Sequence, residues 1–254
     1  MDNVRTALIT GASSGIGASL AVALAASDVT LHLCGRNPTR LEAVAQTCRG
    51  RGGIVTTTTL DVRDADAMAA WIGSAGNFDL VIANAGISGR SRDGGAESWN
   101  LARAIFETNL GGVLNTVLPA MAVMAEQLPG AGGVRGRIAV ISSIAAFMAA
   151  PDSAAYCASK AAVDRWIVAS AHEARQRGIV LTSVCPGFIR TAMTADYRFP
   201  MPGLMDADRA AHVILRGVAA GRVRVVFPWW MGLAARIAGL VPPRMLAAVA
   251  SRHR

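Results

Sequence analysis

The segment Tyr156-Cys-Ala-Ser-Lys160 places a phenol and an ammonium group four residues apart. On a helix this spacing brings both side chains to one face. A phenol with its ordinary pKa of about 10 is a poor acid–base catalyst at neutral pH, but a neighbouring cation favours the phenolate and lowers that pKa. The pair therefore predicts proton exchange with a carbonyl or an alcohol. The alternative is a surface Tyr/Lys pair without a chemical role.

The lysine of this pair is the single lysine of the chain, because the other 24 of the 25 basic residues are arginines. An arginine at position 160 would also be a cation, but its guanidinium is a planar fork rather than a compact head with three donors. A compact head fits a gap between a ribose and a phenol more readily. We therefore expect Lys160 to lie in such a gap.

Further polar side chains are candidates for the same site. Ser143 precedes Tyr156 by thirteen residues, at the end of an expected strand, where its hydroxyl can hold the substrate oxygen. Its neighbour Ser142 is expected to point elsewhere. Asn109, within a long helical region, is a candidate to anchor a water that relays protons to Lys160, although a helical Asn taken alone is more often structural. The candidate catalytic set is therefore Asn109, Ser143, Tyr156 and Lys160.

The glycine-rich segment Thr10–Gly17 has the local context of a phosphate-binding turn. It follows an apolar run at residues 4–10 and opens an alanine-rich helix that extends to about Ser27. Glycines permit a tight turn and close approach of the backbone to a diphosphate, and the helix N-terminus offers unpaired N–H groups. Without this context the glycines would indicate only an ordinary strand-to-helix turn. The expected contacts are Gly11, Ser13, Ser14, Gly15, Ile16 and Gly17.

The ends of the following strands indicate which dinucleotide binds. An NAD site usually places an acid after the second strand, on the ribose 2′-hydroxyl, but the segment Cys34-Gly-Arg-Asn37 holds no acid. Arg36 can instead pair with a 2′-phosphate, which favours NADP over NAD, although NAD stays possible. The alternative is a solvated arginine that opens a helix. Further expected contacts, near the adenine and along the cofactor floor, are Asp61, Val62, Asn84, Ala85 and Gly86.

Strands alternate with helices along most of the chain. Strand-like runs lie at residues 4–10, 29–34, 54–60, 80–83, 137–142, 179–185 and 223–227. Helical segments end at about residue 27, cover 38–49, 98–127 and 153–176, and begin at Asp64 and Asp206. Such alternation indicates βαβ units and a parallel sheet, and Asp64 is expected to cap its helix. The predicted fold is a single α/β domain with a doubly wound parallel sheet of the Rossmann type, in three layers.

Taken together, these motifs resemble the compact, single-domain branch of the short-chain dehydrogenase/reductase family. The similarity covers about residues 4–228 and rests, in the family's order and spacing, on Thr10–Gly17, Asp61, Asn84-Ala-Gly86, Asn109, Ser143, Tyr156, Lys160 and Pro186-Gly187. The resemblance implies that Tyr156 is the general acid/base and that Lys160 binds the nicotinamide ribose and lowers the tyrosine pKa. It implies that Ser143 positions the carbonyl and that Asn109 supports the proton relay. The contacts that it implies beside the nicotinamide are Pro186, Gly187, Ile189 and Thr191.

Composition excludes several other classes of protein. The chain has 254 residues, of which 52% are hydrophobic and 17% charged, and this excludes a disordered chain. No run of about 18 uncharged apolar residues occurs, so we expect no membrane-spanning helix. Four widely spaced cysteines, without a CxxC or Cys/His cluster, indicate free thiols in a reducing cytosol and no metal site. We therefore expect a cytoplasmic protein.

The formal net charge of +8 lies entirely in the C-terminal part of the chain. Residues 1–208 carry 17 basic and 17 acidic side chains, whereas residues 209–254 carry eight arginines and no acid. We divide the chain into a catalytic domain at 1–228 and an apolar, arginine-rich tail at 229–254. The tail suits either a membrane interface or subunit contacts in the homodimer or homotetramer that the family resemblance implies. No recognition motif for nucleic acid accompanies the charge, so we expect no nucleic-acid binding.

Residues 188–205 are expected to form a mobile loop and helix that cover the substrate as a lid. The apolar members of this segment include Met193, Tyr197, Phe199, Met201, Leu204 and Met205. Because flexible, methionine-rich surfaces adapt to apolar ligands, the lid predicts a small apolar carbonyl or alcohol substrate, such as an acyl or lipid-like ketone. The alternative is a lid that only packs on its own domain.

The sequence therefore predicts an NADP(H)-dependent oxidoreductase that interconverts a ketone and a secondary alcohol by hydride transfer, with Tyr156 moving the proton. A non-catalytic NAD(P)-binding scaffold or a membrane-docked redox sensor is the alternative. The complete Ser/Tyr/Lys set favours the enzyme.

Overall fold

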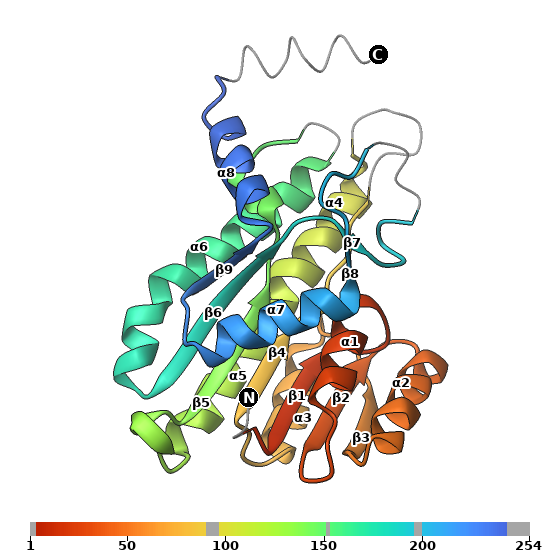
Figure 1. The fold of residues 1–254 in the computed structure, drawn as a ribbon, viewed down its shortest axis with the longest axis vertical. Coiled ribbons are helices and arrows are strands. Elements are labelled where there is room, and N and C mark those ends of the chain that lie inside the picture. Colours follow the sequence, from red (N-terminus) through yellow and green to blue (C-terminus); the bar gives the residue numbers. More distant parts are fainter. Residues whose placement is uncertain (1–3, 90–96, 151–152, 196–199, 243–254) are drawn as a thin grey trace.

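The computed structural model describes residues 4–89, 97–150, 153–195 and 200–242. Its centre is a seven-stranded parallel sheet in the order β3-β2-β1-β4-β5-β6-β9 (Figure 1). The strands are β1 (Thr6–Thr10), β2 (Thr30–Gly35), β3 (Ile54–Thr59), β4 (Leu80–Ala83), β5 (Gly136–Ile141), β6 (Ile179–Pro186) and β9 (Arg224–Phe227). All seven strands predicted from the sequence are present, so the doubly wound α/β fold is confirmed.

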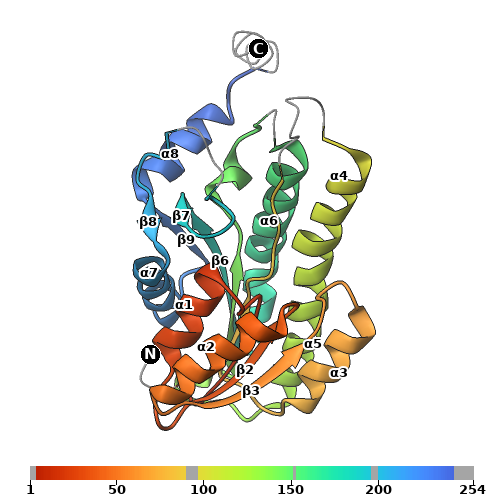
Figure 2. The same cartoon turned by 90° about the vertical axis from the view of Figure 1, so that its right-hand side faces the viewer.

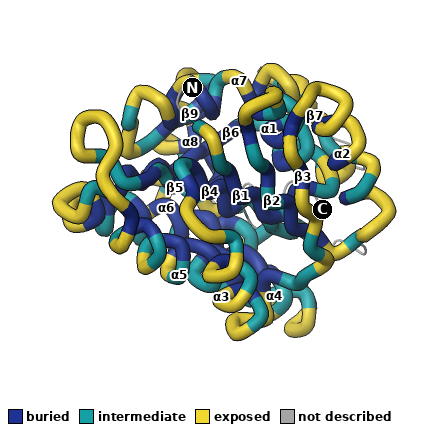
Figure 3. Tube along the Cα trace, turned by 90° about the horizontal axis from the view of Figure 1, so that it is seen from below, coloured by how far each residue is buried: buried dark blue, intermediate teal, exposed yellow. Residues whose placement is uncertain are grey.

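Helices cover both faces of the sheet and give the predicted three layers (Figures 2 and 3). One face carries α1 (Gly15–Leu24), α2 (Pro38–Gly50) and α7 (Ala207–Ala219), and the other α3 (Ala65–Ser74), α5 (Gly112–Glu126) and α6 (Ala154–Gln176). Successive side chains of a strand point to opposite faces. In β1, accordingly, Ala7 and Ile9 enter the core on one side and Leu8 enters the core on the other. The strand β1 is therefore buried over most of its length on both faces, whereas the edge strand β3, with four threonines, is mostly exposed.

Capping residues set where several helices begin. The carboxylate of Asp64 accepts a hydrogen bond of 3.0 Å from the Ala67 N–H at the start of α3, which confirms the predicted cap. Asp206 precedes α7 as predicted, but its side chain does not cap the helix. Instead its carboxylate accepts a bond of 2.9 Å from Arg190 Nε. The acid therefore holds two strands together rather than satisfying the helix N-terminus.

The predicted helix at 98–127 is continuous but changes its winding in the middle. It consists of α4 (Trp99–Phe106), a single π-helical segment η1 (Glu107–Gly111) and α5. Among the described residues, Trp99–Glu126 is the one helical segment long and apolar enough by composition to cross a bilayer. In this fold, however, Val113, Val117 and Ala120 of the segment belong to the core beneath the sheet.

Two short elements and a last helix follow β6. The strands β7 (Ile189–Arg190) and β8 (Met205–Asp206) pair in a separate two-stranded sheet at the base of the predicted lid. The described residues of 188–205 form strands and turns and not the expected helix. Residues 196–199, with Tyr197 and Phe199, lie outside the described residues. The helix α8 (Trp229–Ala238) packs on a short helix, η3 (Ile144–Phe147), through Met231 and Ala235. The first part of the predicted tail therefore contributes to a small apolar cluster, and the division at residue 228 stays a prediction.

Candidate active site

A cavity of about 540 Å³ opens where the parallel strands end at their carboxyl sides. This edge contains the point between β1 and β4 at which the strand order reverses, and open α/β sheets bind their ligands at such a point. Of the expected site residues, those that line the cavity are Gly11, Ser13, Ser14, Gly15, Ile16, Arg36, Asp61, Val62, Asn84, Ala85, Gly86, Ser143, Tyr156, Lys160, Pro186, Gly187, Ile189 and Thr191. Gly17 and Asn109 lie outside this lining. The structure therefore brings nearly all the predicted residues to one place.

The turn between β1 and α1 is held by side chains of two other segments. Gly11 has a φ of +65°, and a Cβ on it would lie 2.8 Å from Ala85 Cα, so only glycine fits there. The Asn84 side chain donates to the carbonyls of Thr10 and Gly11, at 3.1 Å each. The Thr10 hydroxyl accepts hydrogen bonds from the N–H groups of Asn84 and Ala85. Asn84 thus clamps the glycine turn, and Thr10 is a supporting residue that sequence reasoning did not single out.

The N-terminus of α1 is open toward the cavity. Its N-cap residue, Ser14, makes no side-chain capping bond, and the first turn contains no acid. Unpaired N–H groups and the positive end of the helix dipole therefore face a space lined by Ser13, Gly15 and Ile16. A Cβ on Gly17 would overlap the Gly11 carbonyl oxygen and the Asn84 side chain, so this glycine lets α1 pack closely on the turn that precedes it. The cradle fits the diphosphate of a dinucleotide.

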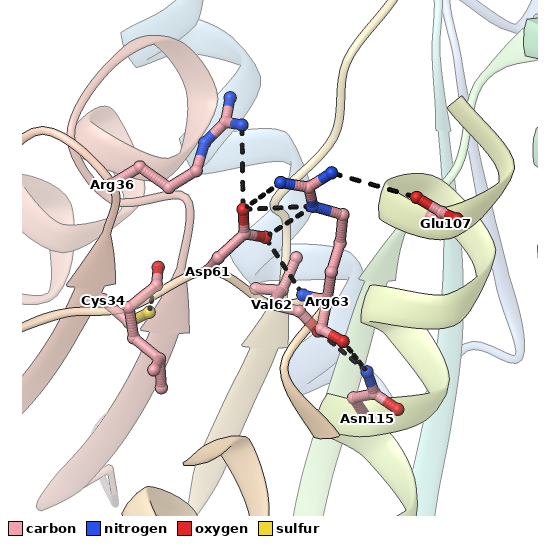
Figure 4. A network of polar contacts seen from close by, with 8 residues as sticks. Cys34, Arg36, Asp61, Val62, Arg63, Glu107 and Asn115 are labelled. Atoms are coloured by element: carbon pink, nitrogen blue, oxygen red, sulfur yellow. Dashed lines mark hydrogen bonds and ion pairs between the residues drawn. The ribbon is translucent and has the colours of Figure 1, made fainter. Parts of the chain in front are cut away.

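At one end of the cavity an aspartate is enclosed by arginines (Figure 4). Both carboxylate oxygens of Asp61 accept hydrogen bonds from Arg63, at 2.7 to 3.1 Å, and Arg36 Nη1 lies 3.9 Å from Asp61 Oδ2. The hydrogen bonds from Arg63 are the main reason that the pKa of Asp61 lies below its ordinary value. Arg63 Nη1 also lies 3.8 Å from a carboxylate oxygen of Glu107. Sequence reasoning missed Arg63, although the Asp-x-Arg spacing after a strand was its signal.

Tyr156 and Lys160 project from the first turns of α6 into the inner part of the cavity. The Lys160 ammonium lies 5.8 Å from the centre of the Tyr156 ring and is almost fully buried. Burial lowers the pKa of Lys160 to about 8, because removal from water disfavours the charged form. Lys160 Nζ donates a bond of 2.8 Å to the carbonyl of Ile141, the last residue of β5. The strand end therefore fixes the cation beside the phenol.

The two neighbouring serines after β5 have different partners. The Ser142 hydroxyl donates to the carbonyl of Lys160 at 2.9 Å and thereby ties β5 to α6. The Ser143 oxygen accepts a bond of 3.1 Å from the Ala145 N–H at the start of η3, and its side chain lines the cavity. Accepting that bond leaves the hydroxyl proton of Ser143 able to donate to a ligand. Ser143, rather than Ser142, is therefore placed to contact a substrate oxygen.

Asn109 lies behind the cavity wall, in η1, and is fully buried. Its side chain accepts a bond of 2.8 Å from the Ile87 N–H and donates to the Ile87 carbonyl and to the Ser159 hydroxyl, at 2.9 and 3.1 Å. These bonds join the segment after β4 to α6. The side chain of Asn109 is thus a clamp, and both of its donors are already used. Its expected part in a proton relay stays a prediction.

Beyond Tyr156 the cavity wall becomes apolar. This part is lined by Ile87, Ile144, Met148, Cys157, Phe188 and Met193. Among the described residues around the cavity, the charged ones are Arg36, Arg40, Asp61 and Lys160. Three of these four lie at the far end, after β2 and β3. The space next to the phenol therefore suits a neutral, apolar ligand.

A buried ion pair lies beneath the candidate catalytic residues. The carboxylate of Asp164, on α6, accepts two bonds from Arg224 of β9 and one of 2.7 Å from the Ser183 hydroxyl. The Cys185 thiol donates to the same carboxylate at 3.5 Å, and burial raises the pKa of this thiol to about 12. The guanidiniums of Arg224 and Arg236 lie over the ring of Phe147, 5.6 and 4.4 Å from its centre. None of these contacts follows from a local sequence motif.

Comparison with known proteins agrees with this geometry. A family model described as short chain dehydrogenase matches residues 5–200. An uncharacterized oxidoreductase of Myxococcus xanthus is 35% identical over 254 residues and is matched over 98% of both chains. The crystal structure of a short-chain type dehydrogenase/reductase from Mycobacterium marinum gives a TM-score of 0.77 at 28% identity, over 87% of this chain and 93% of that chain.

A further solved structure is that of a 3-ketoacyl-ACP reductase from Sinorhizobium meliloti. It gives a TM-score of 0.75 at 27% identity, over 90% of this chain and 99% of that chain. Sequence, fold and site geometry thus lead to one conclusion. The chain belongs to the short-chain dehydrogenase/reductase family and is an NAD(P)-dependent oxidoreductase.

Proposed function

We propose that the protein is an NADP(H)-dependent oxidoreductase that interconverts a ketone and a secondary alcohol, on an apolar, acyl or lipid-like substrate. The observation that carries this proposal is the buried Lys160 ammonium beside the Tyr156 ring, in a cavity that continues to the open N-terminus of α1. A nicotinamide cofactor, when bound, supplies or accepts the hydride. The protein's own side chains must then hold the substrate oxygen and move one proton.

Tyr156 is proposed as the general acid/base. A pH of about 7 lies below the Lys160 pKa of about 8, so the lysine remains mostly a cation. A cation beside a phenol favours the phenolate, which brings the tyrosine pKa closer to the working pH. Ser143 is proposed to donate its hydroxyl proton to the same substrate oxygen. Lys160 and Ser143 therefore prepare the site, and Tyr156 transfers the proton.

The preference for NADP is proposed from the charges at the other end of the cavity. Arg36 and Arg40 line this end, and the Arg36 side chain is more than half exposed. The nearby acid, Asp61, is occupied by Arg63 and so presents little free negative charge to a 2′-phosphate. Arginine forks suit phosphate oxygens. Residues 11–17, Asp61, Val62 and Asn84–Gly86 are proposed to bind the rest of the nucleotide, and Pro186, Gly187, Ile189 and Thr191 the nicotinamide side.

The apolar substrate is proposed from the wall next to Tyr156. Its side chains, among them Ile144, Met148 and Phe188, offer no charged partner for a polar substrate. The similar protein from Sinorhizobium meliloti is a 3-ketoacyl-ACP reductase, which supports an acyl ketone as a substrate class. A long flexible chain gains most from such a wall because each buried methylene contributes about 0.8 kcal/mol.

The assembly that we propose is a homodimer or homotetramer in the cytoplasm. It rests on the family, whose members generally form oligomers, and size-exclusion chromatography with light scattering measures it directly. A monomer at micromolar concentration would contradict it.

The decisive assay for the activity mixes the purified protein with a series of ketones of rising chain length. NADPH and NADH are compared by following the absorbance of the reduced nicotinamide at roughly 340 nm. The proposal expects turnover with NADPH that improves as the alkyl chain lengthens. Tight NADPH binding without turnover of any ketone or alcohol would instead support a non-catalytic scaffold.

A further inference from the structure

Of the described residues that line the cavity, Asp61 is the one acid. It lies just after β3, and Arg36 lies just after β2. These two strands pair in parallel, with Gly35 opposite Thr59, so their ends bring the acid and the arginine to the same edge of the sheet. Arg36 Nη1 lies 3.9 Å from Asp61 Oδ2, which is too far for a hydrogen bond. A negative charge therefore lies beside the cation that we assign to the 2′-phosphate of NADP.

A carboxylate without a cation of its own would favour NAD at this edge. Such a carboxylate accepts hydrogen bonds from a ribose hydroxyl, whereas it repels a 2′-phosphate. It would also draw Arg36 into a close ion pair and so withdraw this guanidinium from a phosphate. The edge therefore combines an arginine that favours NADP with an acid that opposes it, and the outcome depends on what neutralises the acid.

Arg63 covers Asp61 although it does not itself line the cavity (Figure 4). Its Nε lies 3.1 and 3.0 Å from the two carboxylate oxygens, and its Nη2 lies 2.7 Å from Oδ2. The Arg63 backbone N–H donates a further bond of 3.0 Å to Oδ1. The side-chain bonds between the two residues are the main reason that the pKa of Asp61 is lowered and the pKa of Arg63 is raised. The pair therefore stays ionised, and its two charges cancel.

Contacts from the helices behind it hold Arg63 in this position. The Asn115 side chain, on α5, donates to the carbonyls of Val62 and Arg63, at 2.9 and 3.4 Å. Arg63 Nη1 lies 3.8 Å from a carboxylate oxygen of Glu107, which also accepts a bond of 2.6 Å from Arg103 Nε. Because the guanidinium is already held over its carboxylate, cofactor binding does not have to order it.

We propose that Arg63 determines the choice between NADP and NAD, as a positioning residue that covers Asp61 and keeps Arg36 available for the 2′-phosphate. This role rests on the proposed function, of which the NADP preference is a part. With Arg63 in place, the positive charges of Arg36 and Arg40 at the cavity lining are not offset by the acid. Without Arg63, Asp61 offsets one of them and repels the phosphate directly.

Isothermal titration of the full-length protein with NADPH and with NADH tests this role. The quantity compared is the Kd of NADPH divided by the Kd of NADH. We expect Arg63→Gln to raise this ratio about tenfold, because the uncovered carboxylate opposes only the cofactor that carries the phosphate. Arg63→Lys keeps the charge but loses the planar fork, so its ratio should lie between those of the wild type and Arg63→Gln.

The double variant Asp61→Asn/Arg63→Gln removes the acid together with the arginine that covers it. Its ratio should return to within about twofold of the wild type, because Arg36 no longer has a carboxylate beside it. Any contact of Asp61 with the remainder of the nucleotide is common to both cofactors and cancels in the ratio. Loss of a merely structural contact at Arg63 would weaken both cofactors equally and leave the ratio unchanged.

The matched control is Arg103→Gln, which removes the same charge from the same group of ion pairs. Arg103 bonds Glu107 and does not line the cavity, so its ratio should stay within about twofold of the wild type. An equal rise in this control would overturn the role of Arg63, since the effect would then be one of net charge. Failure of the double variant to restore the ratio would overturn it as well.

The wild type separates this role from the proposed cofactor preference. If it prefers NADH and Arg63→Gln still raises the ratio, only the proposed NADP preference is contradicted. If it prefers NADPH and Arg63→Gln leaves the ratio unchanged, only the role of Arg63 is contradicted.

Discussion

The guanidinium of Arg224 binds both carboxylate oxygens of Asp164 in the interior of the domain, at 2.9 and 2.7 Å. Asp164 is 1% exposed and lies on α6 about two helical turns after Tyr156. Arg224 also lies over the ring of Phe147, in the short helix that follows Ser143. The ion pair therefore connects the last strand of the sheet to both elements that present the candidate catalytic side chains.

Removing one partner of this pair should destabilise the protein strongly. In Arg224→Met the Asp164 carboxylate stays buried without its cation, and we expect the free energy of unfolding to fall by about 3 kcal/mol or more. Urea denaturation measures the change. The matched control is Arg190→Met, which breaks an ion pair with Asp206 whose side chains are both mostly exposed, and which should cost at most about 1 kcal/mol.

The double variant Asp164→Leu/Arg224→Met separates the ion pair from simple packing. Because it removes both charges, it should recover much of the stability that Arg224→Met loses. If Arg224→Met were no less stable than Arg190→Met, the pair would not be an important interaction of the folded state.

Local patterns in the sequence predict most of the fold and the position of the site. The apolar run Leu80–Ala83 is a buried strand because both faces of the sheet are covered. Asp64 caps α3 because its side chain reaches an N–H three residues ahead. The residues of Thr10–Gly17 are neighbours in one turn, and Tyr156 and Lys160 lie about one helical turn apart. Interactions of this short range are encoded by spacing alone.

The supporting contacts depend instead on which distant segments the sheet brings together. Asp164 and Arg224 are separated by 60 positions, and they meet because β9 adds to the sheet beside β6. Asn109 and Ile87 meet because η1 passes behind the end of β4. Spacing in the sequence carries no signal for such pairs. The sequence did not predict that α8 packs on η3 either. The buried face of α8 consists of only Met231, Gly232 and Ala235, which is too short to give a clear pattern.

Tyr156→Phe removes the proposed proton donor while leaving the ring in place. We expect kcat for ketone reduction to fall by about 10²- to 10⁴-fold, the usual contribution of a general acid. NADPH binding, measured by fluorescence titration, should change little because the phenol oxygen is the only group removed. Normal turnover by this variant would contradict the role assigned to Tyr156.

Burial of Lys160 predicts how stability changes with pH. The folded-state pKa is about 8 and the ordinary value is 10.5, so below pH 8 the buried ammonium opposes folding. Between about pH 8 and 10.5 the unfolded chain binds more protons than the folded one, and stability rises with pH. Lys160→Met should lack this rise. Urea unfolding of both proteins is measured at steps across this pH range. The contributions of the other titrating groups cancel in the difference between the two proteins. Parallel curves of stability against pH would contradict the burial of the charge.

Arg36 should decide between the two nicotinamide cofactors. Its guanidinium lies 3.9 Å from Asp61 Oδ2, a loose contact, because Arg63 already supplies the close hydrogen bonds to that carboxylate. Arg36 is therefore able to turn to a 2′-phosphate, and Arg36→Ala should weaken NADPH binding by about 10- to 100-fold, the value of one charge-assisted hydrogen bond, without changing the Kd of NADH.

The control for this change is Arg49→Ala, in helix α2, which begins two residues after Arg36; Arg49 is paired with Glu42 and lies away from the cavity lining. Isothermal titration with NADPH and with NADH gives two dissociation constants for each protein. Since Arg49 does not contact the cavity, its loss should leave all affinities unchanged, which separates a specific contact from the general loss of one positive charge. Preference of the wild type for NADH, or equal weakening of both cofactors by Arg36→Ala, would mean that Arg36 does not recognise the 2′-phosphate.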